Sequence, residues 1–160
     1  MNSRLAPIIA AIALSALLCA GCARPSSPSD QPHKHVHHPP HGGTPVVLGD
    51  EIYHIELVLD QKAGRLQAYV FDGELENFIR SGESSIEIDA TVGGAPRALV
   101  LSAVANPATG ETVGDTSLFE GQADWLRSAG EFDGVLRTIT IRGTTFTDVK
   151  FNYPKGNDTD

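Results

Sequence analysis

All the histidines of this 160-residue chain lie in one stretch, Gln31 to Glu56 (QPHKHVHHPPHGGTPVVLGDEIYHIE). Neutral imidazole is the commonest protein ligand for zinc, copper and nickel. This clustering predicts that the region binds a transition-metal ion. Histidine and carboxylate ligands suit zinc, copper, nickel and cobalt, so they do not identify which of these metals is bound. The candidate ligands are His33, His35, His37, His38, His41, His54 and Glu56.

The first histidines have a spacing that suits a flexible metal-binding tract. In an extended chain His33, His35 and His37 fall on one side, with about 7 Å between successive backbone positions. In a polyproline helix, which has three residues per turn, His38 and His41 share a side. Such a tract loses chain entropy when its rings gather around an ion. We therefore expect adaptable sites of modest affinity, suited to scavenging, buffering or transfer of an ion.

The last two histidines differ from the tract because a predicted strand fixes one of them. His54 lies on the same side of that strand as Glu56, and His41 precedes a Gly-Gly pair that allows a tight turn. The sequence predicts a defined site in which His41 folds back to meet His54. Glu56 or Glu51 would then serve as third ligand or as the group that orients a ligand ring.

The start of the chain carries a targeting pattern. An apolar run, Leu5 to Leu18, follows Arg4 and ends at LLCAGC. The run is shorter than the roughly 20 residues of a membrane span. It resembles a bacterial lipoprotein signal, in which Cys22 would become the acylated first residue, although Cys19 stands where that family most often has Leu. We expect residues 1–21 to be this signal; an ordinary secretory signal or an uncleaved anchor is the alternative.

Residues 22–40 read as a lipid-anchored linker rich in Pro, Ser and His, too polar to fold by itself. The resemblance implies a protein held on a membrane by acyl chains and facing the periplasm, and Ala23 after Cys22 favours the outer membrane. Because Cys22 would be the only cysteine left after cleavage, a disulfide framework and a cysteine-based zinc site are excluded.

From Pro45 onward the chain alternates apolar and polar residues with a period of two. We count about eight short strands, with turn residues every 8 to 12 positions and no long amphipathic helix. This pattern predicts an all-β domain over residues 41–153, an antiparallel β-sandwich (Ig-like) or a small barrel, with the sandwich favoured. In the strand YHIELVLD, Ile55 and Leu57 should face the core, whereas His54 and Glu56 should face outward. Residues 154–160 should form a disordered tail.

The charge balance limits the partners. Lys and Arg number 12 against 20 Asp and Glu, a net charge of -8. Nucleic acid is an improbable partner for such a surface, whereas a cation is attracted to it. The chain has no nucleophile elbow, phosphate-binding glycine loop or HExxH motif, and we therefore expect a protein that is not an enzyme.

The stretch PHGGTPVVLGDEIYHIELVLDQKAGRLQAYVFDG resembles a pattern of bacterial periplasmic lipoproteins and of the periplasmic adaptor subunits of heavy-metal efflux systems. The resemblance implies a small β domain that handles transition-metal ions, with efflux components as partners. The chain departs from the adaptors in having no coiled-coil hairpin or lipoyl-like segment, so we do not expect it to be a complete adaptor. It also has no histidine near the C-terminus that could complete a second half-site. The matching residues are Pro40, His41, Gly42, Gly43, Tyr53, His54 and Glu56.

Two functional hypotheses follow. The first is a lipid-anchored, periplasm-facing protein that binds a transition-metal ion for buffering, delivery or an accessory role in efflux. The second is a non-catalytic structural or interaction module of the cell envelope whose histidines only solubilise the linker. His-rich tracts are assigned by composition alone, so both hypotheses stand at this level.

Overall fold

The computed structural model describes residues 38–158. The expected signal, the lipidation site Cys22 and the candidate ligands His33, His35 and His37 lie outside these residues. Among the residues described, no helix is long and apolar enough to cross a membrane.

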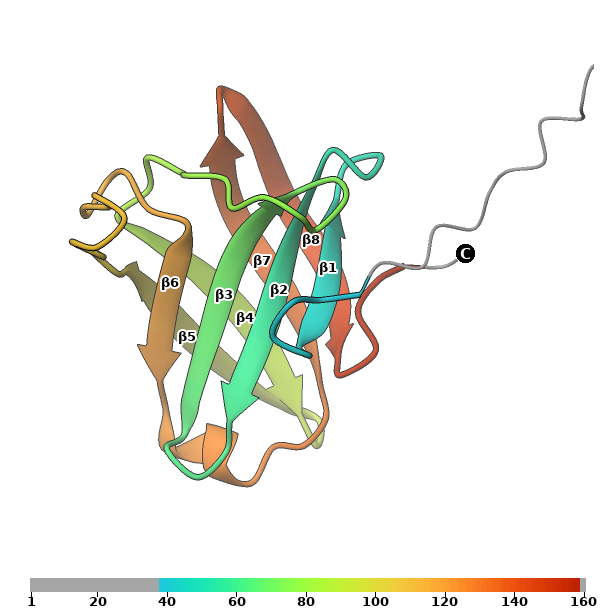
Figure 1. Ribbon diagram of the computed structural model, residues 1–160. Coiled ribbons are helices and arrows are strands. Elements are labelled where there is room, and N and C mark those ends of the chain that lie inside the picture. Colours follow the sequence, from blue (N-terminus) through green and yellow to red (C-terminus); the bar gives the residue numbers. More distant parts are fainter. Residues whose placement is uncertain (1–37, 159–160) are drawn as a thin grey trace, which may run out of the picture. The chain divides into compact units, whose positions relative to one another are not determined.

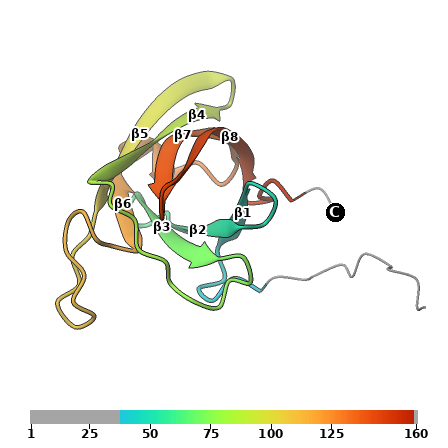
Figure 2. The ribbon, with the colours of Figure 1, turned by 90° about the horizontal axis from the view of Figure 1, so that it is seen from above.

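The folded part is all-β, with antiparallel strands in a single sheet that curls into a nearly closed barrel (Figures 1 and 2). The order across the sheet is β1-β2-β3-β6-β5-β4-β7-β8. The predicted fold class is confirmed, and of the two architectures considered the small barrel is the one observed. The strands are β1 (Thr44–Leu48), β2 (Tyr53–Asp60), β3 (Arg65–Asp72), β4 (Ser85–Val92), β5 (Ala95–Ala103), β6 (Leu118–Gln122), β7 (Phe132–Ile141) and β8 (Thr144–Tyr153); a short 3-10 helix, η1 (Asp124–Arg127), follows β6.

The barrel interior is filled by one face of each strand. On β4 the burial alternates strictly, with Ile86, Ile88 and Ala90 inside and Glu87 and Asp89 exposed. The interior void that Val46, Ile55 and Phe151 help to line is only about 10 Å³. A void of this size holds at most about one water molecule. The interior is therefore a packed core without room for a ligand.

The seam between β1 and β8 is closed by the chain that follows β8. The side-chain amide of Asn157 accepts a hydrogen bond from the backbone N–H of Val47 (2.7 Å) and donates one to the Val47 carbonyl (3.1 Å). Thr44 Oγ1 also donates to the carbonyl of Pro154 (3.2 Å). The sequence predicts a disordered tail from residue 154, whereas these contacts fix residues 154–157 against β1.

Candidate functional site

The outward faces of β2 and β3 bring the predicted site residues together with two aromatic side chains. The register pairs His54 with Phe71 and Glu56 with Tyr69. Because strand residues alternate between faces, these four lie opposite the core-facing Ile55. His54 and Glu56 lie on the side of β2 that the alternation predicts, away from the barrel interior, but this side is covered rather than open to solvent. The exposed fractions of His54 and Glu56 are 1% and 0%.

A second layer covers this face. In the segment before β1, the His41 ring stacks on the Tyr69 ring, with ring centroids 4.0 Å apart and an angle of 15° between the planes. The loop after β3 lays Phe78 on Phe71, with centroids 4.6 Å apart. His41 and Phe78 themselves lie 6.1 Å apart. We call this face and its covering layer together the outer cluster; it consists of His41, His54, Glu56, Tyr69, Phe71 and Phe78.

The Glu56 carboxylate holds the covering segment in place. Its Oε1 accepts hydrogen bonds from the backbone N–H groups of His41 and Gly43, both at 2.8 Å, and its Oε2 lies 2.7 Å from Nδ1 of His41. A buried carboxylate is costly unless it is hydrogen-bonded in this way. When an ionised Glu56 faces a neutral His41, Nδ1 is the donor, because a carboxylate can only accept, and Nε2 then keeps its lone pair.

The Gly-Gly pair after His41 makes this approach geometrically feasible. Gly42 has a φ of +68° and donates its N–H to the carbonyl of Pro39 (3.0 Å), which turns the chain. At Gly43 a Cβ atom would lie 2.5 Å from the Leu57 carbonyl oxygen, closer than side chains tolerate. The Gly-Gly pair is therefore what allows the segment to dock on Glu56.

His54 occupies a different environment from His41. It is buried beneath the covering layer, and its Nδ1 lies 3.4 Å from the backbone carbonyl of Asp72. The structure joins His41 to Glu56 as a hydrogen-bonded pair. Within residues 38–158, no group of three or more His, Cys, Asp or Glu side chains is arranged to hold a metal ion.

The histidines nearest the surface are His38 and His41. The His41 side chain is 35% exposed, although one ring nitrogen is bound to the buried Glu56. His38 is exposed three positions earlier in the chain. The site therefore centres on the partly exposed His41, whose Nδ1 faces the Glu56 carboxylate, with His38 exposed nearby.

Sequence reasoning missed the aromatic members of the outer cluster. Tyr69 and Phe71 alternate in the strand that returns from the hairpin, so the hairpin register could have placed them opposite Glu56 and His54. Phe78 lies in a loop and gave no local signal. Burial, and then the charge of Glu56, raise the pKa of the Tyr69 hydroxyl.

No protein-family model, curated protein or solved structure matches this chain. The functional argument therefore depends on the geometry of the outer cluster and its surroundings.

Proposed function

We propose that this protein is a lipid-anchored, periplasm-facing lipoprotein that binds a transition-metal ion through Nε2 of His41. The observation that carries the proposal is the 2.7 Å contact between Nδ1 of His41 and the buried carboxylate of Glu56. Zinc, copper, nickel and cobalt all suit an imidazole donor.

The contact with Glu56 is the kind of support that metal-binding histidines usually have. Such a histidine donates its other ring N–H to a carboxylate, carbonyl or water, which fixes the tautomer and raises the basicity of the ligating nitrogen. At His41 the stacked ring of Tyr69 also restricts the plane of the imidazole. A ring held in this way loses less conformational freedom on binding than a ring on a flexible tract.

One imidazole does not complete a coordination shell, since zinc typically takes four ligands. In this proposal the remaining donors are His33, His35, His37 and His38, which precede His41 by three to eight residues. In this proposal His54, which is buried in the outer cluster, is not among the ligands. The resulting sites would exchange ions readily, which suits buffering or delivery beside a heavy-metal efflux system.

The hydrogen bonds of Glu56 also support a second candidate function. Two of the three hydrogen bonds of Glu56 come from backbone N–H groups, those of His41 and Gly43, and so serve to dock the segment regardless of any metal. In this alternative the protein is a structural or interaction module of the cell envelope, and His41 only completes the packing on Tyr69.

Metal titration of variants separates the two candidates. The full chain, purified in detergent, is titrated by calorimetry with Zn²⁺, Cu²⁺, Ni²⁺ and Co²⁺ at pH 7.5. We expect His41→Ala to weaken binding at least tenfold, and Glu56→Gln to weaken it by about tenfold to a hundredfold, as for other carboxylates that support ligands. Glu87→Gln removes the same charge from an exposed position on β4 and serves as the matched control.

The same titrations can also disprove the metal-binding proposal. If none of the four ions binds the full chain, or if binding is unchanged in His41→Ala, the metal-binding proposal fails and the structural module remains. Thermal unfolding of each variant shows whether a lost signal comes from lost ligation or from an unfolded domain.

A further inference from the structure

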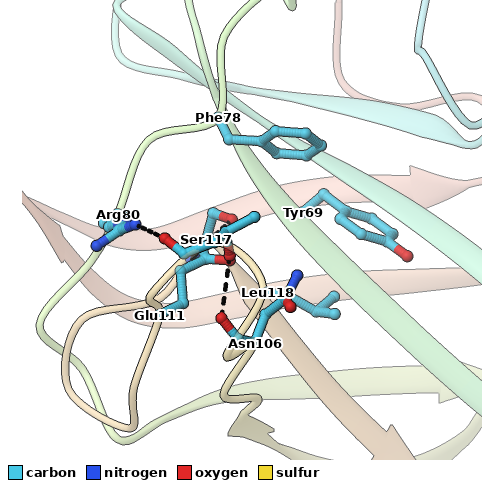
Figure 3. A pocket seen from close by; sticks show the side chains of 8 residues that line it. Tyr69, Phe78, Arg80, Asn106, Glu111, Ser117 and Leu118 are labelled. Atoms are coloured by element: carbon cyan, nitrogen blue, oxygen red, sulfur yellow. Dashed lines mark hydrogen bonds between the residues drawn. The ribbon is translucent and has the colours of Figure 1, made fainter.

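An open pocket of about 280 Å³ lies beside the outer cluster, between β3 and the two long loops, residues 73–84 and 104–117 (Figure 3). Tyr69 and Phe78 belong to both the pocket wall and the outer cluster, whereas His41 and Glu56 do not line the pocket. Pockets for drug-sized ligands begin at about 300 Å³, so this one suits a ligand of about a single ring.

One wall of the pocket is aromatic and firmly supported. The Tyr69 and Phe78 rings lie 6.2 Å apart at the centroids, with planes tilted by 47°. Phe78 is 54% exposed, yet its ring is stacked on Phe71. Its loop is also tied to β3, because the N–H of Ile79 donates to the carbonyl of Val70 (2.9 Å). An exposed ring held on a rigid support is a ready stacking platform.

The facing wall is polar, and its charged groups are held in place (Figure 3). Arg80 donates to Asp115 Oδ2 (2.8 Å) and to the carbonyl of Thr109 (2.6 Å). The buried Glu111 accepts from the backbone N–H (2.8 Å) and hydroxyl (2.6 Å) of Ser117 through Oε1, and from the Thr109 hydroxyl (2.6 Å) through Oε2. Both Glu111 oxygens are therefore already satisfied within the protein.

The polar groups of the pocket that make no hydrogen bond within the described residues are mostly hydrogen-bond donors. Asn106 Oδ1 accepts from the N–H of Ala108 (3.1 Å), while its Nδ2 donates no hydrogen bond within residues 38–158. The Tyr69 hydroxyl likewise makes none in that part of the chain, and the Arg80 guanidinium uses two of its five N–H groups. A ligand in this pocket needs oxygen acceptors at its edge.

The local charge argues against an anion. Arg80 is paired with Asp115 and lies close to Glu111, so two carboxylates outweigh one guanidinium, in a chain whose net charge is -8. A wholly apolar ligand is also disfavoured, because it would strip water from the polar wall without replacing its hydrogen bonds.

We propose that this pocket binds a neutral sugar ring. The C–H faces of a pyranose would pack against Phe78 and Tyr69, and its ring-edge oxygens would accept hydrogen bonds from Asn106, Arg80 and the Tyr69 hydroxyl. This site is separate from the metal-binding proposal, since neither His41 nor Glu56 lines the pocket. Failure of one proposal leaves the other untouched.

Saturation-transfer difference NMR on the full chain, in a detergent without a sugar headgroup, tests the inference. The probes are glucose, galactose and N-acetylglucosamine, with the acyclic polyol sorbitol as a negative control. We expect transfer to the ring protons of at least one pyranose and none to sorbitol. Asn106→Ala and Phe78→Ala should each weaken that binding at least fivefold, whereas Ile52→Ala, which removes an exposed apolar side chain elsewhere, should leave it unchanged.

Asn106→Ala is the decisive variant, because Asn106 is exposed and takes no part in the ring contacts of Tyr69, Phe71 and Phe78. The proposal is overturned if none of the three sugars gives transfer, or if transfer persists unchanged in Asn106→Ala. Tighter binding of benzoate than of any sugar would also overturn it, because the pocket would then select an anion.

Discussion

The barrel interior and the outer cluster are both buried, but they are built from different chemistry. The interior consists of aliphatic and aromatic side chains such as Leu57, Leu101 and Phe119. The outer cluster encloses a carboxylate and two imidazoles among aromatic rings, under a segment and a loop that fold over the sheet. The two faces of β2 thus serve two functions, stability on one side and a preorganised polar site on the other.

The largest effect should come from the interior. We expect Leu101→Ala to lower the free energy of unfolding by about 3 kcal/mol, because it removes a fully buried side chain and leaves a cavity. Its neighbour Val100 is 56% exposed, and Val100→Ala should change the free energy by less than about 0.5 kcal/mol. Urea denaturation measures both. Equal losses in the two variants would contradict the assigned barrel interior.

The outer cluster should be less sensitive, and its loss should be local. Glu56→Ala leaves the N–H groups of His41 and Gly43 without their acceptor, which should cost about 2 kcal/mol. Hydrogen exchange should then quicken at these two amides, with little change on β7. Glu87→Ala, at an exposed position, serves as the control. Unchanged exchange at Gly43 would show that Glu56 does not hold the segment.

A smaller loss is expected at Gly43, where an added methyl group would collide with the Leu57 carbonyl. Since the segment can lift slightly from the barrel, we expect Gly43→Ala to cost about 1 to 2 kcal/mol, within the usual range for a single substitution. At Gly130 an added Cβ would lie 3.8 Å from Nε2 of Gln61, an ordinary contact distance, so Gly130→Ala should be close to neutral. The melting temperatures of Gly43→Ala and Gly130→Ala, measured by thermal unfolding, test this difference. Equal melting temperatures would contradict the tight fit at Gly43.

The smallest effect is a pH dependence from the pocket wall. Burial works to raise the pKa of Glu111, but hydrogen bonds from Ser117 and Thr109, helped by the charge of Arg80, outweigh it and hold the pKa below its ordinary value of 4.5. The unfolded state then binds the proton more readily, so this contribution is present above pH 4.5 and is lost as the pH falls through the folded-state pKa. Glu111→Gln should show a shallower loss of stability between pH 5 and 3 in urea titrations. Identical slopes would contradict the assignment.

Much of the fold could be predicted because it depends on local alternation. The period-two pattern of β2 and β4 fixes which residues face the interior, and most of the turns lie between such runs. Closure of the sheet into a barrel could not be predicted in the same way. It depends on the pairing of β3 with β6 and on Asn157 bonding to Val47, contacts between residues far apart in the sequence.

The site could also be predicted in part from local sequence signals. The Gly-Gly pair after His41 indicated a tight approach, and the structure brings His41 to Glu56. Burial of His54 could not be foreseen, because it requires the covering segment and the loop carrying Phe78 to pack over the sheet. The pocket beside them is formed by two loops whose sequences carry no periodic pattern.

Nitrogen-15 NMR of the imidazoles in the full chain tests the central claim most directly. Without metal, His41 should show a protonated Nδ1 and an unprotonated Nε2, as the contact with Glu56 requires. On adding zinc at pH 7.5, the Nε2 resonance of His41 should move to the range of a metal-bound nitrogen while Nδ1 stays protonated, and this change should be absent in His41→Ala. A His41 spectrum that does not respond to zinc, or one in which Nδ1 binds the ion, would contradict the account.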